Sequence, residues 1–180
     1  MSQLVITAVG PDRAGLVEHL AAYLHDAGAN LADSRMVNLR GRFALLMLVE
    51  CSEEQANTIR ANIPTIGNDV GLTIQIVDGA GADEEATTKP GLPLRLKVFA
   101  MDQPGIVHRI TQLAHRYNAN IEELETELRA GSYSGVPLFA LDLTMTVPPQ
   151  TSIRNLRADL ESLCDELNCD FELTRGDTAD

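Results

Sequence analysis

The sequence predicts an α+β protein that consists of two copies of one module. The first observation is an internal repeat: residues 4–17 match residues 94–107 at a constant offset of 90, and 29–31 match 119–121 at the same offset. The second is that the hydrophobic period in each copy changes in the same order between the spacing of a strand and that of a helix. A repeat of 90 residues indicates a duplicated domain, because solenoid repeats have periods of about 20 to 50 residues.

The apolar pattern of the first copy predicts six elements. Short apolar or alternating runs are typical of strands, and apolar residues three and four apart are typical of a helix face. We expect Pro64 to stop the second helix, because proline lacks a backbone N–H and clashes with the preceding turn. The predicted elements are a strand over 4–9, a helix from Leu16 to near Gly28, strands over 31–39 and 43–50 joined by the tight turn Arg40-Gly41-Arg42, a helix through Ala56, Ile59 and Ile63, and a strand from Leu72 to Ile76.

The second copy repeats these elements, with a longer hairpin tip at residues 131–135. Its predicted elements are a strand over 94–101, a helix from Ile106 to Tyr117, strands over 121–128 and 138–147, a helix lined by Ile153, Leu156, Leu160, Leu163 and Leu167, and a strand over 171–174. The order β-α-β-β-α-β with right-handed crossovers predicts a ferredoxin-like fold, in which two helices cover one face of a four-stranded antiparallel sheet.

This pattern predicts an N-terminal domain over 1–78, a linker over 79–91 and a C-terminal domain over 92–176. The linker is rich in small, polar, proline and glycine residues and has no apolar period. The sheet face away from the helices is left open in a lone module. Because covering that face or extending the sheet edges would stabilise such a module, we expect two copies to associate and the protein to form a homodimer.

The charge of the chain argues against direct nucleic-acid binding. It carries 14 basic and 26 acidic residues, a net charge of −12, and no basic run. DNA-binding surfaces gain much of their affinity from lysine and arginine on phosphates. No apolar run reaches the roughly 20 residues that a membrane span needs, and no secretory signal is visible at Met1. The three cysteines lack C-x-x-C spacing, so we expect reduced thiols and a cytoplasmic location.

No catalytic or cofactor motif occurs in the sequence. It lacks G-x-S-x-G, the Walker loop, H-E-x-x-H and G-x-G-x-x-G. His108 and His115 are two helical turns apart, about 10 Å, which is too far to share one metal ion. We therefore expect no enzymatic activity, no cofactor and no metal site.

The loop between the first strand and the first helix of each copy is the candidate binding site. Free N–H groups at a helix N-terminus suit a carboxylate, a glycine there allows close approach, and an aspartate could accept from an ammonium group. Together with an asparagine that opens the next strand, these groups suit an amino acid. The residues concerned are Asp12, Gly15 and Asn30 in the first copy and Asp102, Gly105 and Asn120 in the second.

A purely structural interpretation of the same residues stays open. An aspartate before a helix is an ordinary N-cap, and a glycine there can serve close packing between strand and helix. An asparagine at a strand start is common turn chemistry. Duplication copies such structural devices as faithfully as it copies a binding site, so the repeat does not decide between the two interpretations.

The loop Asp12-Arg13-Ala14-Gly15-Leu16-Val17, followed by Gly28-Ala29-Asn30-Leu31-Ala32-Asp33-Ser34-Arg35-Met36 and by the run over 43–49, resembles the ACT-domain pattern. The tandem form resembles the glycine cleavage system transcriptional repressor group. The second copy departs from the pattern where Gln103 replaces Arg13. The resemblance implies ligand-binding positions at Asp12, Arg13, Ala14, Gly15, Leu16, Asn30 and Leu31, and at Asp102, Gln103, Pro104, Gly105, Ile106, Asn120 and Ile121.

The resemblance implies a sensor of a small amino acid, glycine or serine, bound at an interface between modules. It also implies a regulator of glycine cleavage that acts through a protein partner such as a DNA-binding regulator. The excess of acidic residues agrees with action through a protein partner and not through direct binding to DNA. An alternative is an accessory regulatory subunit of an amino-acid metabolic enzyme. An enzyme in its own right is a third reading, since ferredoxin-like folds also support catalysis.

Overall fold

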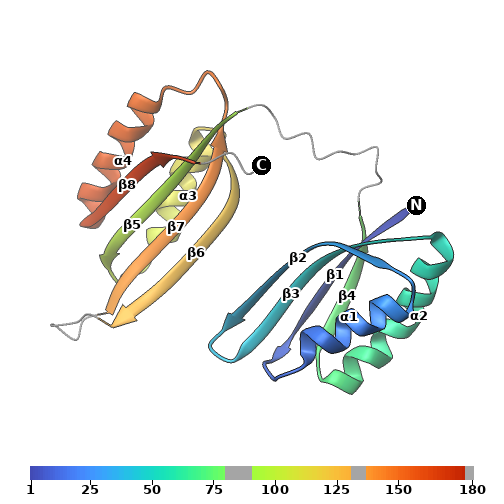
Figure 1. The fold of residues 1–180 in the computed structure, drawn as a ribbon. Coiled ribbons are helices and arrows are strands. Elements are labelled where there is room, and N and C mark those ends of the chain that lie inside the picture. The colour runs from blue at the N-terminus through green and yellow to red at the C-terminus, as the bar shows by residue number, and fades with distance from the viewer. Residues whose placement is uncertain (80–90, 131–136, 177–180) are drawn as a thin grey trace. The chain divides into compact units, whose positions relative to one another are not determined.

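The computed structural model describes residues 1–79, 91–130 and 137–176. The chain divides into two compact units, Met1–Thr87 and Thr88–Asp180, and each has its own sheet and its own pair of helices (Figure 1). The expected linker at 79–91, apart from its two end residues, lies outside the described residues. The expected hairpin tip at 131–135 also lies outside them.

The N-terminal unit is a four-stranded antiparallel sheet in the order β2-β3-β1-β4, with both helices on one face (Figure 1). This order confirms the predicted ferredoxin-like fold. The elements of the unit are β1 (Ser2–Pro11), α1 (Leu16–Asp26), β2 (Asn30–Leu39), β3 (Arg42–Cys51), α2 (Glu53–Val70) and β4 (Thr73–Asp78).

The C-terminal unit repeats this topology, and its sheet has the order β6-β7-β5-β8. Even an irregularity is repeated: a register shift in the second strand falls between Leu31 and Asp33 in one unit and between Ile121 and Glu123 in the other. The elements of this unit are β5 (Leu92–Met101), α3 (Ile106–Arg116), β6 (Asn120–Ala130), β7 (Pro137–Val147), α4 (Ile153–Leu167) and β8 (Cys169–Arg175).

Each core lies between the sheet and the two helices. In β1 the alternate residues Leu4, Ile6 and Ala8 are fully buried, whereas Val9 on the opposite face is 51% exposed. Successive side chains of a strand point to opposite faces of the sheet, so this alternation marks the helix-covered face and the open face. The tight turn between β2 and β3 has Arg40 and Gly41 at φ 51° and 80°, as a two-residue type I′ hairpin requires.

The expected stop of the second helix at Pro64 is wrong. The helix α2 runs through Pro64 to Val70, and Gly71 ends it in the left-handed conformation at φ 67°. The proline removes one helical hydrogen bond, but the turn after it buries Gly67 and Val70 against the core. Burial of this last turn outweighs the local penalty, and the helix continues.

The second strand of each unit is an exposed sheet edge. Every residue of β2 is exposed, and β6 is exposed from Glu122 to Arg129. The reason is topological, because β2 and β6 lie at the ends of their sheets with a neighbour on one side only. Each edge therefore presents unpaired backbone N–H and C=O groups beside half-exposed side chains such as Leu31 and Leu128.

Candidate functional site

The corner between the first strand and the first helix of each unit is built on a glycine. Gly15 and Gly105 are the N-cap residues of α1 and α3, at φ 91° and 97°. An added Cβ at either glycine would meet no described atom within 4 Å. The left-handed backbone, and not a lack of space, is therefore the reason that glycine suits both corners.

These two helix starts are uncapped, unlike the other two. In α2 the side chain of Ser52 accepts a hydrogen bond from the N–H of Gln55, and Ser152 does the same for Asn155 in α4. In α1 and α3 the described residues provide no side-chain cap. The first N–H groups of these helices have no intrahelical acceptor, so both corners present donors and the positive end of the helix dipole to an anion.

Asp12 does not cap α1, so the structural interpretation that made it an N-cap is wrong. Its backbone N–H donates to the carbonyl of Gly41 at 2.9 Å, and its carboxylate accepts a hydrogen bond from the amide of Asn38. The side chain of Asn38 also accepts from the N–H of Gly41 at 3.1 Å. Asp12 therefore attaches the corner to the β2–β3 turn, and the hydrogen bond to Asn38 already uses part of its acceptor capacity.

The two corners differ in the residue after the aspartate. Arg13 is exposed and forms no hydrogen bond or ion pair with any described residue. At the equivalent position, the amide of Gln103 donates to the carbonyl of Leu167 at the end of α4. The N-terminal corner thus retains an uncommitted cation beside its N–H groups, whereas the C-terminal corner has a neutral side chain that is already bound.

The predicted site residues at the strand starts lie at the other end of each sheet. Asn30 pairs with Glu50, which also pairs with Gln3 near the start of β1, whereas the corner follows Pro11 at the end of β1. Pro11 lies eight positions after Gln3 along the strand, a distance of roughly 26 Å. Asn120 is likewise level with Pro93, at the start of β5. A single unit therefore does not bring the two groups of predicted residues together.

The remaining predicted residues differ in what their side chains can contact. Leu16 and Ile106 are 3% and 1% exposed, so their side chains belong to the cores and only their backbones remain for a ligand. Leu31, by contrast, is 42% exposed on the edge strand. Exposed side chains also occur at Ala14, Asn30, Asp102, Pro104 and Asn120, and Ile121 is half-buried.

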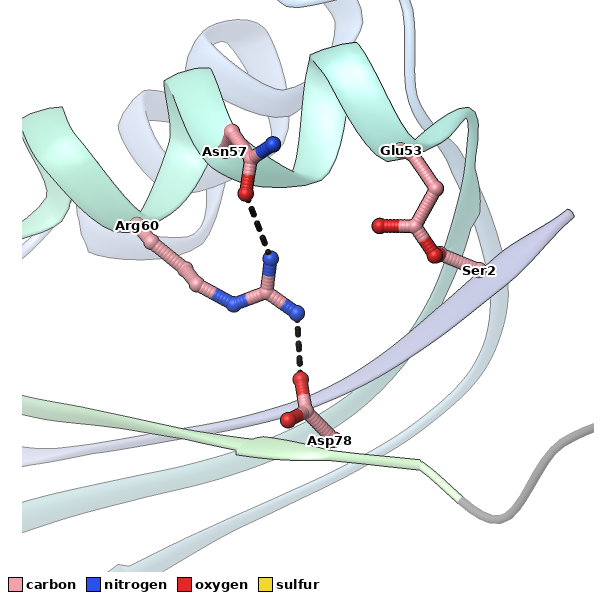
Figure 2. Close-up of polar contacts among 5 residues, drawn as sticks. All are labelled: Ser2, Glu53, Asn57, Arg60 and Asp78. Atoms are coloured by element: carbon pink, nitrogen blue, oxygen red, sulfur yellow. Dashed lines mark hydrogen bonds and ion pairs between the residues drawn. The ribbon is translucent and has the colours of Figure 1, made fainter.

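A polar cluster occupies the sheet end where β1 starts and β4 finishes (Figure 2). Arg60 of α2 donates to the side chain of Asn57 at 3.1 Å and forms an ion pair with Asp78 of β4. Ser2 donates to the carboxylate of Glu53. Each of these groups has a partner within the cluster, so we interpret it as a surface connection between the second helix and the sheet.

Sequence reasoning missed a polar groove between α3 and α4. A cavity of about 410 Å³ opens there, and its long side chains are partly paired, with Arg109 bonded to Glu166 at 2.5 Å. The hydroxyl of Tyr117 donates to Asp159 at 2.9 Å. The signal available in the sequence was only polar residues three and four apart on two helices, which is typical of any solvated helix face. The lining residues are Arg109, Gln112, Arg116, Asp159, Ser162, Leu163 and Glu166.

The described residues contain no group of three or more histidine, cysteine, aspartate or glutamate side chains that could hold a metal ion. Burial, together with a hydrogen bond that its S–H donates to the neighbouring Cys169, raises the pKa of the Cys164 thiol to about 12, so it stays protonated at neutral pH and is a poor nucleophile. In the same part of the chain, no helix has the length and apolar character needed to cross a membrane.

Both units are therefore small α+β modules whose first helix starts at an uncapped glycine. A family model of the ACT domain matches residues 2–77, and the second unit repeats the same topology. The N-terminal unit therefore matches the ACT domain, and the C-terminal unit repeats its fold, so the chain resembles a tandem ACT-domain protein.

Relatives extend this similarity along the chain. The glycine cleavage system transcriptional repressor of Escherichia coli (strain K12) is 27% identical over 169 residues, which cover 92% of this chain and 85% of that protein. The UPF0237 protein MK1213 of Methanopyrus kandleri is 32% identical over 76 residues, 41% of this chain and 84% of that protein. A crystal structure of an unknown protein from Galdieria sulphuraria shares the fold, with a TM-score of 0.81 at 24% identity over 97% of this chain and 98% of that one.

Proposed function

We propose that this protein is an amino-acid-sensing regulator of transcription that controls glycine cleavage through a protein partner and has no catalytic activity of its own. The observation that carries the proposal is the N-terminal corner, where the uncapped N–H groups at Gly15 follow Arg13, which has no partner among the described residues. Similarity over 92% of the chain to a protein named as the repressor of that system supports the biological role.

The ligand that these groups suit is a small amino acid, with glycine or serine favoured. A helix N-terminus and a guanidinium both attract a carboxylate. A ligand without a large side chain suits a corner formed by backbone. Because Asn30 lies at the opposite end of its own sheet, we propose that the strand start that completes the site comes from a second copy of the chain.

The partner in this proposal is a DNA-binding regulator, and the protein works in the cytoplasm beside it. The net charge of −12 supports action through a protein, because a surface that binds DNA directly needs lysine and arginine on the phosphates. Binding of the amino acid would then change the affinity for that partner, as the coupling between two distinct sites requires.

The experiment is a thermal-shift screen of the twenty amino acids on the wild type and on two matched variants. A ligand at about 100 times its Kd stabilises the folded state by about 2.7 kcal/mol if it binds that state alone. We expect glycine or serine to raise the melting temperature of the wild type. We expect Gly15→Ala to lose most of this shift, because a methyl group then occupies the anion-binding corner.

Gly105→Ala is the control, since both glycines have nearly the same φ and the same open surroundings. Each substitution costs about 1 to 2 kcal/mol of backbone strain, so the two variants start from similar stability without ligand. Gly105→Ala should keep most of the ligand-induced shift. An equal loss in both variants would contradict binding at the N-terminal corner, and the absence of any shift with any amino acid would overturn the sensing role.

A further inference from the structure

The sheet face away from the helices of the N-terminal unit carries many apolar side chains, and no described element of that unit covers it. Its side chains alternate with the buried ones, and paired residues across the strands share this face, as in the row Leu48, Val5 and Val77. Several are strongly exposed, including Leu39 at 65% and Val77 at 62%. The apolar members of the face are Val5, Val9, Val37, Leu39, Ala44, Leu46, Leu48 and Val77.

The C-terminal unit provides an internal comparison, because the same strands in the same register carry different residues. The row that corresponds to Leu48, Val5 and Val77 is Thr144, Arg95 and Thr174. Leu46 corresponds to Asp142, Val37 to Glu127 and Leu39 to Arg129. An apolar patch of Phe99, Met101 and Leu138 remains only near the corner end of that face.

The charges of the C-terminal face are paired with one another, as on a surface that stays in water. Arg95 donates two hydrogen bonds to the carboxylate of Asp142, at 2.8 and 2.7 Å. Arg129 and Glu127 form an ion pair at 2.7 Å. The duplicated fold therefore tolerates a charged open face, so its topology does not require an apolar one. The topology therefore does not explain why the N-terminal face carries apolar residues.

We propose that the N-terminal units of two copies of this chain pack sheet face against sheet face, with Val5, Leu46 and Val77 near the centre of the interface. Sheets pack face to face at about 10 Å when both inner faces are apolar. A second copy presents the same apolar surface, and a two-fold axis closes the contact with one pair.

The size of the face agrees with a specific dimer. Four strands about 4.8 Å apart and about eight residues long cover roughly 500 Å² per partner, or about 1,000 Å² in total. This is the lower limit for a specific interface, so we expect a reversible dimer. The charges on the same face also suit a copy of itself, because Asp33 and Arg35 of β2 have opposite signs and a two-fold axis can bring them together.

The test transfers the ion pair of the C-terminal face to the N-terminal face. In the variant Val5→Arg with Leu46→Asp, the new residues occupy the positions of Arg95 and Asp142, so the sheet should accommodate them. We expect the wild type to have the mass of two chains in sedimentation equilibrium. The variant should raise the dimer dissociation constant by roughly 100-fold or more, because charges would be buried in an apolar interface.

Thr174→Asp is the matched control, since it adds a charge at the position of the C-terminal face that corresponds to Val77. It should leave the dimer unchanged, and circular dichroism should report folded protein for each variant. If the double variant does not fold, Leu39→Arg at a 65% exposed position takes its place. A wild type with the mass of one chain up to millimolar concentration would overturn the proposal. So would a folded double variant that remains dimeric, or a control that dissociates equally.

Discussion

At the scale of single residues, the two corners share a glycine and differ in the residues near it, and these residues set how well each corner can attract an anion. Gly15 and Gly105 have nearly the same backbone geometry and the same open surroundings. The difference lies one position away from the shared aspartate, where Arg13 has no described partner and Gln103 is bonded to Leu167. We therefore propose that the corner of the first module is the one that binds an anion more strongly.

The ion pair between Arg95 and Asp142 leads to a prediction on pH. The hydrogen bonds from Arg95 lower the pKa of Asp142 below its ordinary value of 3.8. A carboxyl group whose pKa is lower in the folded state stabilises that state above its ordinary pKa, and this contribution disappears as the pH falls through the folded value. Asp142→Asn should therefore reduce stability modestly at neutral pH and have little effect on the acid side of that value.

Urea unfolding at neutral pH and at a pH well below 3.8, on the acid side of the lowered pKa of Asp142, checks this prediction. Asp170→Asn is a suitable control, because Asp170 is also exposed on this sheet face and has no hydrogen bond or ion pair with the described residues. The effect should stay small, since the side chain of Arg95 is 52% exposed and surface ion pairs are screened by water. A loss for Asp142→Asn that is the same at both pH values would contradict the assigned role of the ion pair.

At the scale of elements, α2 departs most from what its sequence predicts. Proline inside a helix removes one N–H donor and strains the turn before it, which is why a stop at Pro64 was expected. The helix continues because Ile63, Gly67 and Val70 all face the core. A local signal was outweighed by tertiary burial of the turn that follows it.

Replacing this proline should stabilise the protein. Pro64→Ala restores a donor for the helix and removes the clash of the ring, and position 64 is exposed, so packing changes little. We expect a gain of about 1 to 2 kcal/mol in the free energy of unfolding, because the penalty of about 3 kcal/mol for proline is partly offset by the lower entropy that proline gives the unfolded chain. Urea unfolding measures this gain in the free energy of unfolding, and Thr65→Ala, at a neighbouring exposed position, is the control. A loss of stability for Pro64→Ala would show that this turn depends on the ring.

At the scale of the whole molecule, the protein contains two separate hydrophobic cores. Ile6 belongs to the core of the N-terminal unit and is 0% exposed, and the equivalent Leu96 belongs to the core of the C-terminal unit and is 2% exposed. Each core is enclosed by its own sheet and helices. We therefore expect each unit to unfold separately, with its own free energy of unfolding.

Matched core variants test this separation. Ile6→Ala and Leu96→Ala each remove a large buried side chain at the same place in the two modules, at a cost of about 2 to 5 kcal/mol. Hydrogen exchange resolved by segment should show faster exchange in β1 and β3 for the first variant, and in β5 and β7 for the second. Equal acceleration in both units by either variant would mean that they unfold together.

Much of this architecture was predictable because it depends on local order along the chain. The 90-residue offset, the alternation of Leu4, Ile6 and Ala8 and the Arg40-Gly41 turn are all short-range patterns, and each predicted element is present in the described residues. The boundaries of α2 were not predictable, because burial of Val70 depends on strands far away in the sequence.

The sequence by itself determined the duplicated ferredoxin-like fold, the glycine corners and the acidic surface. Periodicity and turn residues depend on residues close together in the sequence, and net charge depends on composition alone. Only the tertiary structure decided that Asp12 bonds to Asn38 and that Asn30 lies at the far end of its sheet. It alone also showed which apolar strand residues lie on the sheet face away from the helices of their own unit. The physical reason is that strand pairing and side-chain burial join residues distant in the chain, and no local pattern contains that information.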